Sequence, residues 1–194
     1  MTKQEVQSNI TYNRNLVNQF RREIDSLHNQ VNSLNSRIQQ YDAQIRNLGV
    51  VRQKLEGELA ELQGLRTKLQ CLKDEFSSRQ AKRVSNFNKN DVLSLGMNFI
   101  TSYINGMKDL LSGQEYRNTF NGLVTALEKV LSQIQAKERQ IESTLSQINN
   151  AQRSIDGTRY EINNCHNRIN QKNSDLSYRL QRLHYWEEQL QYAT

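Results

Sequence analysis

The chain has 194 residues, of which 36% are hydrophobic and none is proline. An average globular domain is about 45–50% apolar, so this composition argues against a large single core and excludes most enzyme folds. With 22 asparagines and 21 glutamines, the chain can fold only if its few apolar side chains lie along narrow seams. The absence of proline removes the usual helix breaker and predicts long uninterrupted helices.

The formal net charge of +6 is spread thinly along the chain. One short stretch has several bases and no acid, namely Arg79, Lys82, Arg83 and Lys89. This suggests a small basic cap and argues against a nucleic-acid-binding face. The N-terminal residues lack the apolar run of a secretory signal peptide, and no apolar stretch predicts a transmembrane helix. We therefore expect a cytoplasmic protein whose export, if any, needs no cleaved leader.

Residues 3–80 carry two apolar rows at a spacing of seven. The first row is apolar or aromatic throughout: Phe20, Leu27, Leu34, Tyr41, Leu48, Leu55, Leu62, Leu69 and Phe76. The second row begins Ile10, Val17, Ile24, Val31, Ile38 and Ile45, and continues Arg52, Leu59, Arg66 and Lys73. Interleaving at three and four residues is the pattern of a left-handed coiled coil.

A second array covers residues 115–192. Its first row is apolar at every position: Phe120, Leu127, Ile134, Ile141, Ile148, Ile155, Ile162, Ile169, Leu176, Leu183 and Leu190. We predict as its companion a mixed row of Val124, Leu131, Glu138, Leu145, Gln152, Arg159, His166, Asn173, Leu180 and Glu187. Polar groups at seam positions lower stability while fixing register and partner number. The alternative is that the polar companion row has no such role and the seam is simply narrower and more hydrated there.

Two arrays of nearly equal length predict an antiparallel hairpin, with facing residues whose numbers add to about 195. The expected fold is all-α, a long antiparallel coiled-coil hairpin with a short apolar helix at its tip. We place the N-terminal helix at 1–80, a loop and short helix at 81–113 and the C-terminal helix at 114–194, as one structural unit.

The segment between the arms, 84–113, interrupts the heptads. Asn86, Asn88, Asn90 and Asp91 are turn and cap residues, and Gly113 is a good helix C-cap. Apolar residues then cover nearly every face of a predicted helix, among them Val92, Leu95, Phe99, Tyr103 and Met107. Such a helix needs burial, so it either folds over the hairpin tip or docks on another chain or a lipid surface.

Motifs of catalysis are absent from the sequence, including Gly-rich phosphate loops, Cys-x-x-Cys and His-Glu-x-x-His. His28, Cys165 and His166 would meet in the hairpin register, but a fourth zinc ligand is not evident. Cys71 and Cys165 would lie too far apart for a disulfide. We expect neither enzymatic activity nor a cofactor or metal, since a helical hairpin lacks an enclosing pocket.

The junction reads Leu111-Ser112-Gly113, followed by Tyr116 and Phe120. It resembles the Trp-x-Gly turn of the WXG superfamily, specifically the coiled-coil partner proteins of LXG-type toxins in type VII secretion, with Leu111 at the tryptophan position. The resemblance implies two antiparallel helices with Tyr116 and Phe120 packed on the opposite arm. It also implies a secretion partner that pairs with the helical N-terminal domain of a toxin.

The mixed rows fit that role, because Arg66 and Arg159 at seam positions would be better satisfied by a further helix of complementary charge. Two alternatives stay open. In the first, the chain resembles α-helical pore-forming toxins, and residues 92–111 bind a membrane surface beside the basic cap. In the second, it is a structural spacer or scaffold that self-associates through the middle helix.

Overall fold

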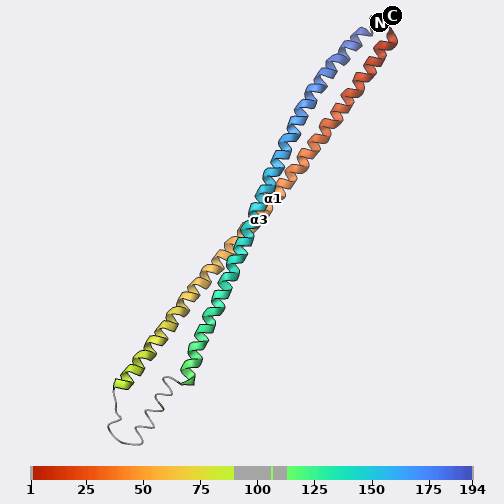
Figure 1. Ribbon diagram of the computed structural model, residues 1–194. Coiled ribbons are helices and arrows are strands. Elements are labelled where there is room, and N and C mark those ends of the chain that lie inside the picture. The colour runs from red at the N-terminus through yellow and green to blue at the C-terminus, as the bar shows by residue number, and fades with distance from the viewer. Residues whose placement is uncertain (1, 90–105, 107–112, 194) are drawn as a thin grey trace, which may run out of the picture. The chain divides into compact units, whose positions relative to one another are not determined.

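The computed structural model describes residues 2–89, 106 and 113–193, with the side chains of residues 86–89 left aside. Two helices make up these residues, α1 (Lys3–Lys89) and α3 (Gln114–Gln189), and they run antiparallel to each other (Figure 1). The predicted all-α helical hairpin is confirmed. The apolar middle segment, with Val92, Leu95, Phe99, Tyr103, Met107 and Leu111, lies outside the described residues.

Local sequence sets the start of α1. The Thr2 amide donates to Glu5 Oε2 at 2.9 Å, and the Glu5 amide donates to Thr2 Oγ1 at 3.3 Å, which is a reciprocal capping box. These hydrogen bonds, chiefly that from the Thr2 backbone, hold the pKa of Glu5 below its ordinary value. The free amide groups of Thr2 and Glu5 at this end of the helix are therefore satisfied.

The end of α1 differs from the prediction. We expected the helix to stop near residue 80 and Asn86 and Asn88 to form a turn, but α1 continues through Lys89. Asparagine costs a helix only about 0.7 kcal/mol relative to alanine, and the stretch lacks proline. Cap propensity therefore does not end the helix at these residues. α3 begins directly after Gly113, whose carbonyl accepts the Arg117 amide at 3.3 Å.

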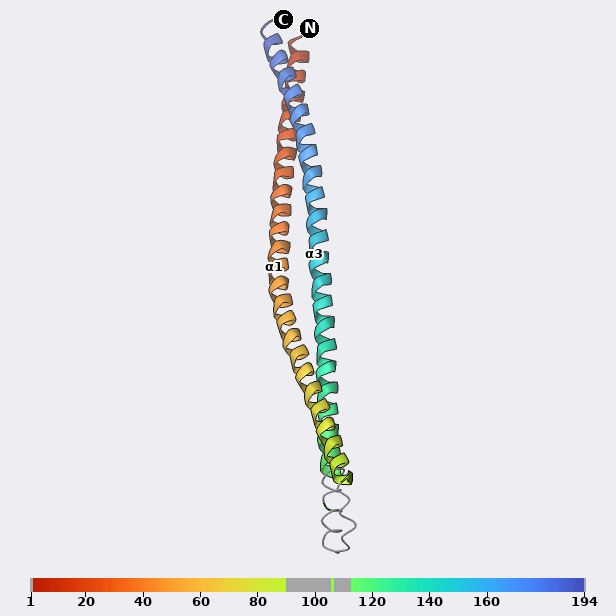
Figure 2. The ribbon, with the colours of Figure 1, turned by 90° about the vertical axis from the view of Figure 1, so that its left-hand side faces the viewer.

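The chain divides into two compact units, each built from part of both helices. Unit 1 comprises Met1–Gly49 and Ser146–Thr194. Its two helical segments lie side by side, and the two chain ends meet at the same end of the unit (Figures 1 and 2). Its main apolar cluster consists of Ile24, Leu27, Val31, Leu34, Cys165 and Ile169, with Ile162 and Leu176 packed against it. Ile162 therefore packs on the cluster that contains Leu34, as the predicted register requires.

Unit 2 comprises Val50–Leu145. Here the second part of α1 packs against the first part of α3, and the core is thin. Only Val130, Ile134 and Thr144 are buried among its described residues. The α1 side chains that face the seam are half-buried, such as Leu55, Leu62 and Leu69. Unit 2 therefore leaves more of its apolar surface open than unit 1.

The companion row that we predicted for α3 is wrong. From Leu131 to Glu187 that row is exposed throughout. The buried or half-buried companion lies one residue earlier, in the row Leu123, Val130, Lys137, Thr144, Ala151, Thr158, Cys165, Lys172, Arg179, Trp186 and Ala193. Spacings of three and four from the first row are equally compatible with a heptad. The row that faces α1 consists largely of small residues and of long side chains with a polar end, such as Lys137 and Lys172. The row with more leucines faces solvent.

With this correction the seam follows heptad letters. On α1 the a row runs from Ile10 to Lys73 and the d row from Val6 to Phe76; on α3 the a row starts at Phe120 and the d row at Tyr116. Every buried residue in the described part of the chain belongs to one of these four rows. The letters e and g denote the flanking positions, and b, c and f the outer ones.

Candidate helix-docking surfaces

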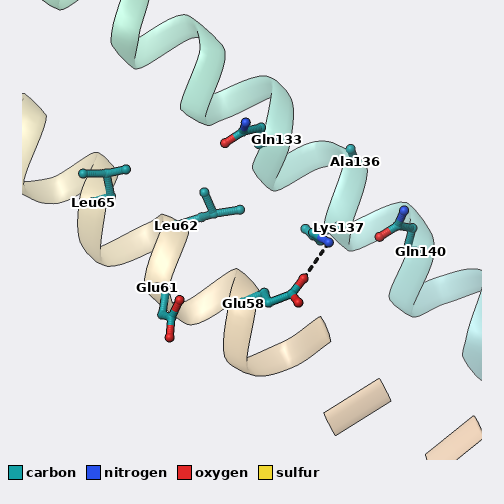
Figure 3. A pocket seen from close by; sticks show the side chains of 8 residues that line it. All are labelled: Glu58, Glu61, Leu62, Leu65, Gln133, Ala136, Lys137 and Gln140. Carbon is teal, nitrogen blue, oxygen red and sulfur yellow. Dashed lines mark ion pairs between the residues drawn. The ribbon is translucent and has the colours of Figure 1, made fainter. Parts of the chain in front are cut away.

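Two lysines occupy d positions in the α3 seam, and each reaches an α1 glutamate at a g position. Lys137 Nζ lies 2.6 Å from Glu58 Oε2 in unit 2 (Figure 3), and Lys172 Nζ lies 2.7 Å from Glu23 Oε2 in unit 1. The lysine hydrogen bond is the main cause that lowers the pKa of Glu58 and of Glu23 below the ordinary value. The long lysine stem covers apolar surface while its ammonium reaches the edge of the seam.

Ion pairs at the flanks of unit 1 follow the antiparallel pattern. Arg14 and Glu187 are both e residues and lie 3.1 Å apart, and Arg37 and Glu161 are both g residues and lie 3.9 Å apart. In an antiparallel pair, e faces e and g faces g. These pairs are about half exposed, so each contributes at most about 1 kcal/mol to stability but opposes a shifted register.

A groove of about 450 Å³ runs between the helices of unit 2. Its walls come from Glu58, Glu61, Leu62 and Leu65 of α1 and from Gln133, Ala136, Lys137 and Gln140 of α3 (Figure 3). The Glu58–Lys137 ion pair lies within this lining, and Leu62, Leu65 and Ala136 contribute its apolar surface. The lining lacks a cluster of nucleophilic or metal-binding groups, so its chemistry is that of helix packing.

Exposed aliphatic side chains concentrate in unit 2. Those of unit 2 are Val50, Val51, Leu65, Leu72, Leu131 and Leu145, with exposed fractions from 38% to 68%, whereas unit 1 has Leu180. The large exposed hydrophobic residues of unit 1 are mostly tyrosines, whose hydroxyl groups tolerate water. Exposed aliphatic rows beside a thin core are typical of surfaces that another helix covers.

One such row lies on α3. Leu131 and Leu145 are both e residues, and Glu138 lies between them. Two further acids, Glu128 and Glu142, flank the row at b positions. These three glutamates take part in none of the ion pairs among residues 2–89 and 113–193. We call Leu131, Leu145 and these three acids the acidic α3 face.

Aromatic residues pack in unit 2 near the last turns of α1 and the first turns of α3. The Tyr116 ring stacks on Phe76 of the opposite helix with centroids 5.1 Å apart and planes 9° apart, and Phe120 lies 6.0 Å from Tyr116. The Lys73 ammonium lies 6.0 Å from the Phe120 ring centroid. This packing follows from the seam, because Phe76, Tyr116 and Phe120 all occupy heptad positions that face the opposite helix.

Neither arginine predicted to face a partner lies buried in the seam. Arg159 is an exposed e residue that lies 3.8 Å from Asp156 of its own helix. Arg66 keeps its a position but is exposed. The sequence pattern did not reveal Lys137 and Lys172 as seam residues or Leu131 and Leu145 as exposed ones, because the wrong α3 row was assigned to the seam. A comparison of both possible companion rows would have found them.

The candidate zinc ligands do not converge. His28 and His166 are exposed, whereas Cys165 is buried, and no group of three metal-binding side chains occurs within the described ranges. Both cysteines are free thiols, with Cys71 exposed. In the helices that the structure describes, no segment is long and apolar enough to cross a membrane.

No protein-family model, no curated protein and no solved structure matches the chain. The function is therefore inferred from the surfaces of the two units.

Proposed function

We propose that this protein is a non-enzymatic helical interaction module that binds an amphipathic helix of another protein along the acidic α3 face. The observation that carries the proposal is that exposed Leu131 and Leu145 are flanked by three glutamates without an ion pair among the described residues. Apolar residues at heptad spacing give a partner helix its contact area, and flanking charges set its orientation and partner choice.

The charges on this face define the chemistry of the partner. Between residues 121 and 145, all the charged side chains at the e and b positions of α3 are glutamates. The facing helix should therefore carry an apolar row of leucine-like residues flanked by lysine or arginine. Unit 2 would become a three-helix bundle and its thin core would gain a third apolar surface.

The biological setting that we propose is type VII secretion, with the partner helix supplied by the helical N-terminal domain of a toxin. The resemblance of Leu111, Gly113, Tyr116 and Phe120 to a WXG-like turn motivates this assignment. The membrane-active alternative depends on residues 92–111, of which the structure describes only residue 106.

The test is to tag the chain in its native host, identify bound proteins by mass spectrometry and measure binding of the recovered partner to purified variants. We expect Leu131→Asp combined with Leu145→Asp to weaken binding by at least about a hundredfold, because two apolar contacts are replaced by carboxylates that must be desolvated. Glu138→Lys should also weaken it. Circular dichroism should show an unchanged helical fold.

The matched control is Tyr160→Asp, which places a charge at a site in unit 1 that is 68% exposed. This variant should bind like the wild type. Equal binding by the wild type and the double Leu131/Leu145 variant would reject the acidic α3 face as the docking site. A recovered partner whose binding segment is acidic or non-helical would reject the proposed chemistry.

A further inference from the structure

A second exposed apolar row lies on α1 in unit 2, on the side that faces the groove. Val51, Leu65 and Leu72 share the g position and are 48%, 45% and 55% exposed. Residues separated by multiples of seven lie on one face of a coiled-coil helix. Leu65 lines the groove, so the row points to the same side as the α3 residues Gln133 and Ala136.

A row of alternating charge runs beside these aliphatic residues. The c positions are Lys54, Glu61, Lys68 and Glu75, and all four are exposed. Lys54 lies 4.0 Å from Glu58 and Glu75 lies 3.1 Å from Arg79 on the same helix. Glu61 and Lys68 take part in none of the ion pairs among the residues described.

This charge row is complementary to itself when it is reversed. A twofold axis near Leu65 places Glu61 against Lys68 of a second copy, and Lys68 against its Glu61. The same axis places Lys54 against Glu75 in both directions. Antiparallel helices related by such an axis bring equal heptad positions together, so the c rows meet along one edge. A parallel pairing in register would instead oppose like charges along the whole row.

We infer that a second copy of this chain docks on this α1 face, antiparallel to the first, and forms a homodimer through unit 2. Leu65 meets its own copy at the axis, the partner's Leu72 falls beside Glu58 at the groove, and the partner's Arg79 falls beside Val51. The Glu58 carboxylate is already held by Lys137, and Arg79 is paired with Glu75 of its own helix, so mainly their methylene groups need to pack. The contact runs from Val51 to Arg79, about 42 Å of helix at the usual rise.

The α3 surface on this side suits such an approach. Ala126, Gln133 and Gln140 at g positions and Ala136 at a c position are small or uncharged, and three of them line the groove. The c row also carries the exposed Lys129, at the outer edge of this surface. Two hairpins can therefore approach with both helices and form a four-helix arrangement without burying an unpaired charge at these α3 positions. This face differs from the acidic α3 face, so the inference goes beyond the proposed function and does not require it.

Sedimentation equilibrium of the full chain at low salt tests the inference, since added salt screens exposed charges. The wild type should reach twice its mass of 22.7 kDa as concentration rises. Glu61→Lys and Lys68→Glu each replace two attractive contacts by two repulsive ones. Each variant should raise the dissociation constant of the dimer by about tenfold or more.

An equimolar mixture of the two single variants is the decisive sample. In a mixed dimer the lysine introduced at position 61 of one chain would face the glutamate introduced at position 68 of the other. The native Glu61 and Lys68 would also face each other, so both contacts are attractive again and the dimer should return. The double variant E61K/K68E should also dimerise. Asp74→Lys, at an exposed b position on the other side of α1, controls for a simple change in net charge and should stay dimeric.

Cross-linking locates the axis. Leu65→Cys in a Cys71→Ser background should form a disulfide-linked dimer on oxidation, because the two thiols meet at the axis. Gly64→Cys in the same background points outward and should cross-link poorly. A monomer at every concentration, a dimer that ignores both charge reversals, or mixed variants that stay monomeric would each overturn the inference. The monomeric single variants should still bind the partner of the acidic α3 face, so failure of one proposal leaves the other measurable.

Discussion

Lys137 Nζ of α3 lies 2.6 Å from Glu58 Oε2 of α1, although Lys137 occupies a seam position where a coiled coil usually carries an apolar residue. The same arrangement occurs between Lys172 and Glu23, five heptads away on both helices. The two pairs therefore specify the same antiparallel register, once in each unit. A shift by one heptad would leave each lysine in the seam without its carboxylate, which is costly in a partly buried position.

Charge reversal at one of these pairs should destabilise its unit, and reversal of both partners should restore it. Lys137→Glu places two carboxylates together at the seam, so we expect the melting temperature to fall. Glu58→Lys added to this variant restores an attractive pair with exchanged signs. Thermal unfolding followed by circular dichroism measures both effects, and the double-mutant cycle gives the coupling.

The second pair supplies the matched control. Glu23→Lys should rescue Lys172→Glu but should leave Lys137→Glu destabilised, because Glu23 belongs to the other unit. Rescue of Lys137→Glu by Glu23→Lys would show that the melting temperature depends on net charge and not on the Lys137–Glu58 and Lys172–Glu23 contacts.

Stability should depend on pH through the same glutamates. The pKa of Glu58 and of Glu23 lies below the ordinary value of 4.5 because a lysine donates a hydrogen bond to the ionised form. Such groups stabilise the folded state above pH 4.5, and this contribution disappears as the pH falls through the lower folded pKa. We therefore expect Glu58→Gln to lower the melting temperature at pH 7 and to match the wild type near the acid end of the titration.

Glu142→Gln is the control for this titration, since Glu142 is an exposed glutamate of the same unit without a partner among the described ion pairs. Its melting curve should follow the wild type across the whole range. A Glu58→Gln variant with a constant difference from the wild type at every pH would mean that the Lys137 contact does not set the titration.

Two adjacent residues test which α3 row forms the seam. Val130 is 6% exposed and Leu131 is 40% exposed. Val130→Asp should lower the free energy of unfolding by about 2–5 kcal/mol, because it buries a charge in place of a packed side chain. Leu131→Asp should change it by less than about 1 kcal/mol. Urea denaturation measures both, and equal losses would restore the leucine-rich row as part of the seam.

Glycines inside the helices reduce stability without a structural need for them. A Cβ atom added at Gly57 or at Gly157 would meet nothing within 4 Å. Alanine at each site should therefore raise the free energy of unfolding by about 0.5–1 kcal/mol, since glycine loses more backbone entropy in a helix. Ala60→Gly, on the exposed surface of α1, should cause a loss of similar size. If neither alanine raised the free energy of unfolding, the backbone at Gly57 and Gly157 would have to depart from regular helical geometry.

The sequence by itself determined the secondary structure and the hairpin. The absence of proline and the sevenfold rows from Phe20 and Phe120 require long helices that bury one stripe. The register followed from equal arm lengths, and the packing of Ile162 against the cluster that contains Leu34 confirms it. Periodicity sufficed here because each row repeats often enough to define one face of a helix.

Only the tertiary structure decided which α3 row accompanies that stripe. A heptad allows the second row at a spacing of three or four, and hydrophobicity favoured Leu131 and Leu145 over the row of Lys137 and Thr144. The facing α1 side chains are large, so the inner α3 row is small or flexible, and apolar leucines remain outside. Packing complementarity between two helices is not encoded in either helix alone, and therefore the candidate docking surfaces emerged only when both were in place.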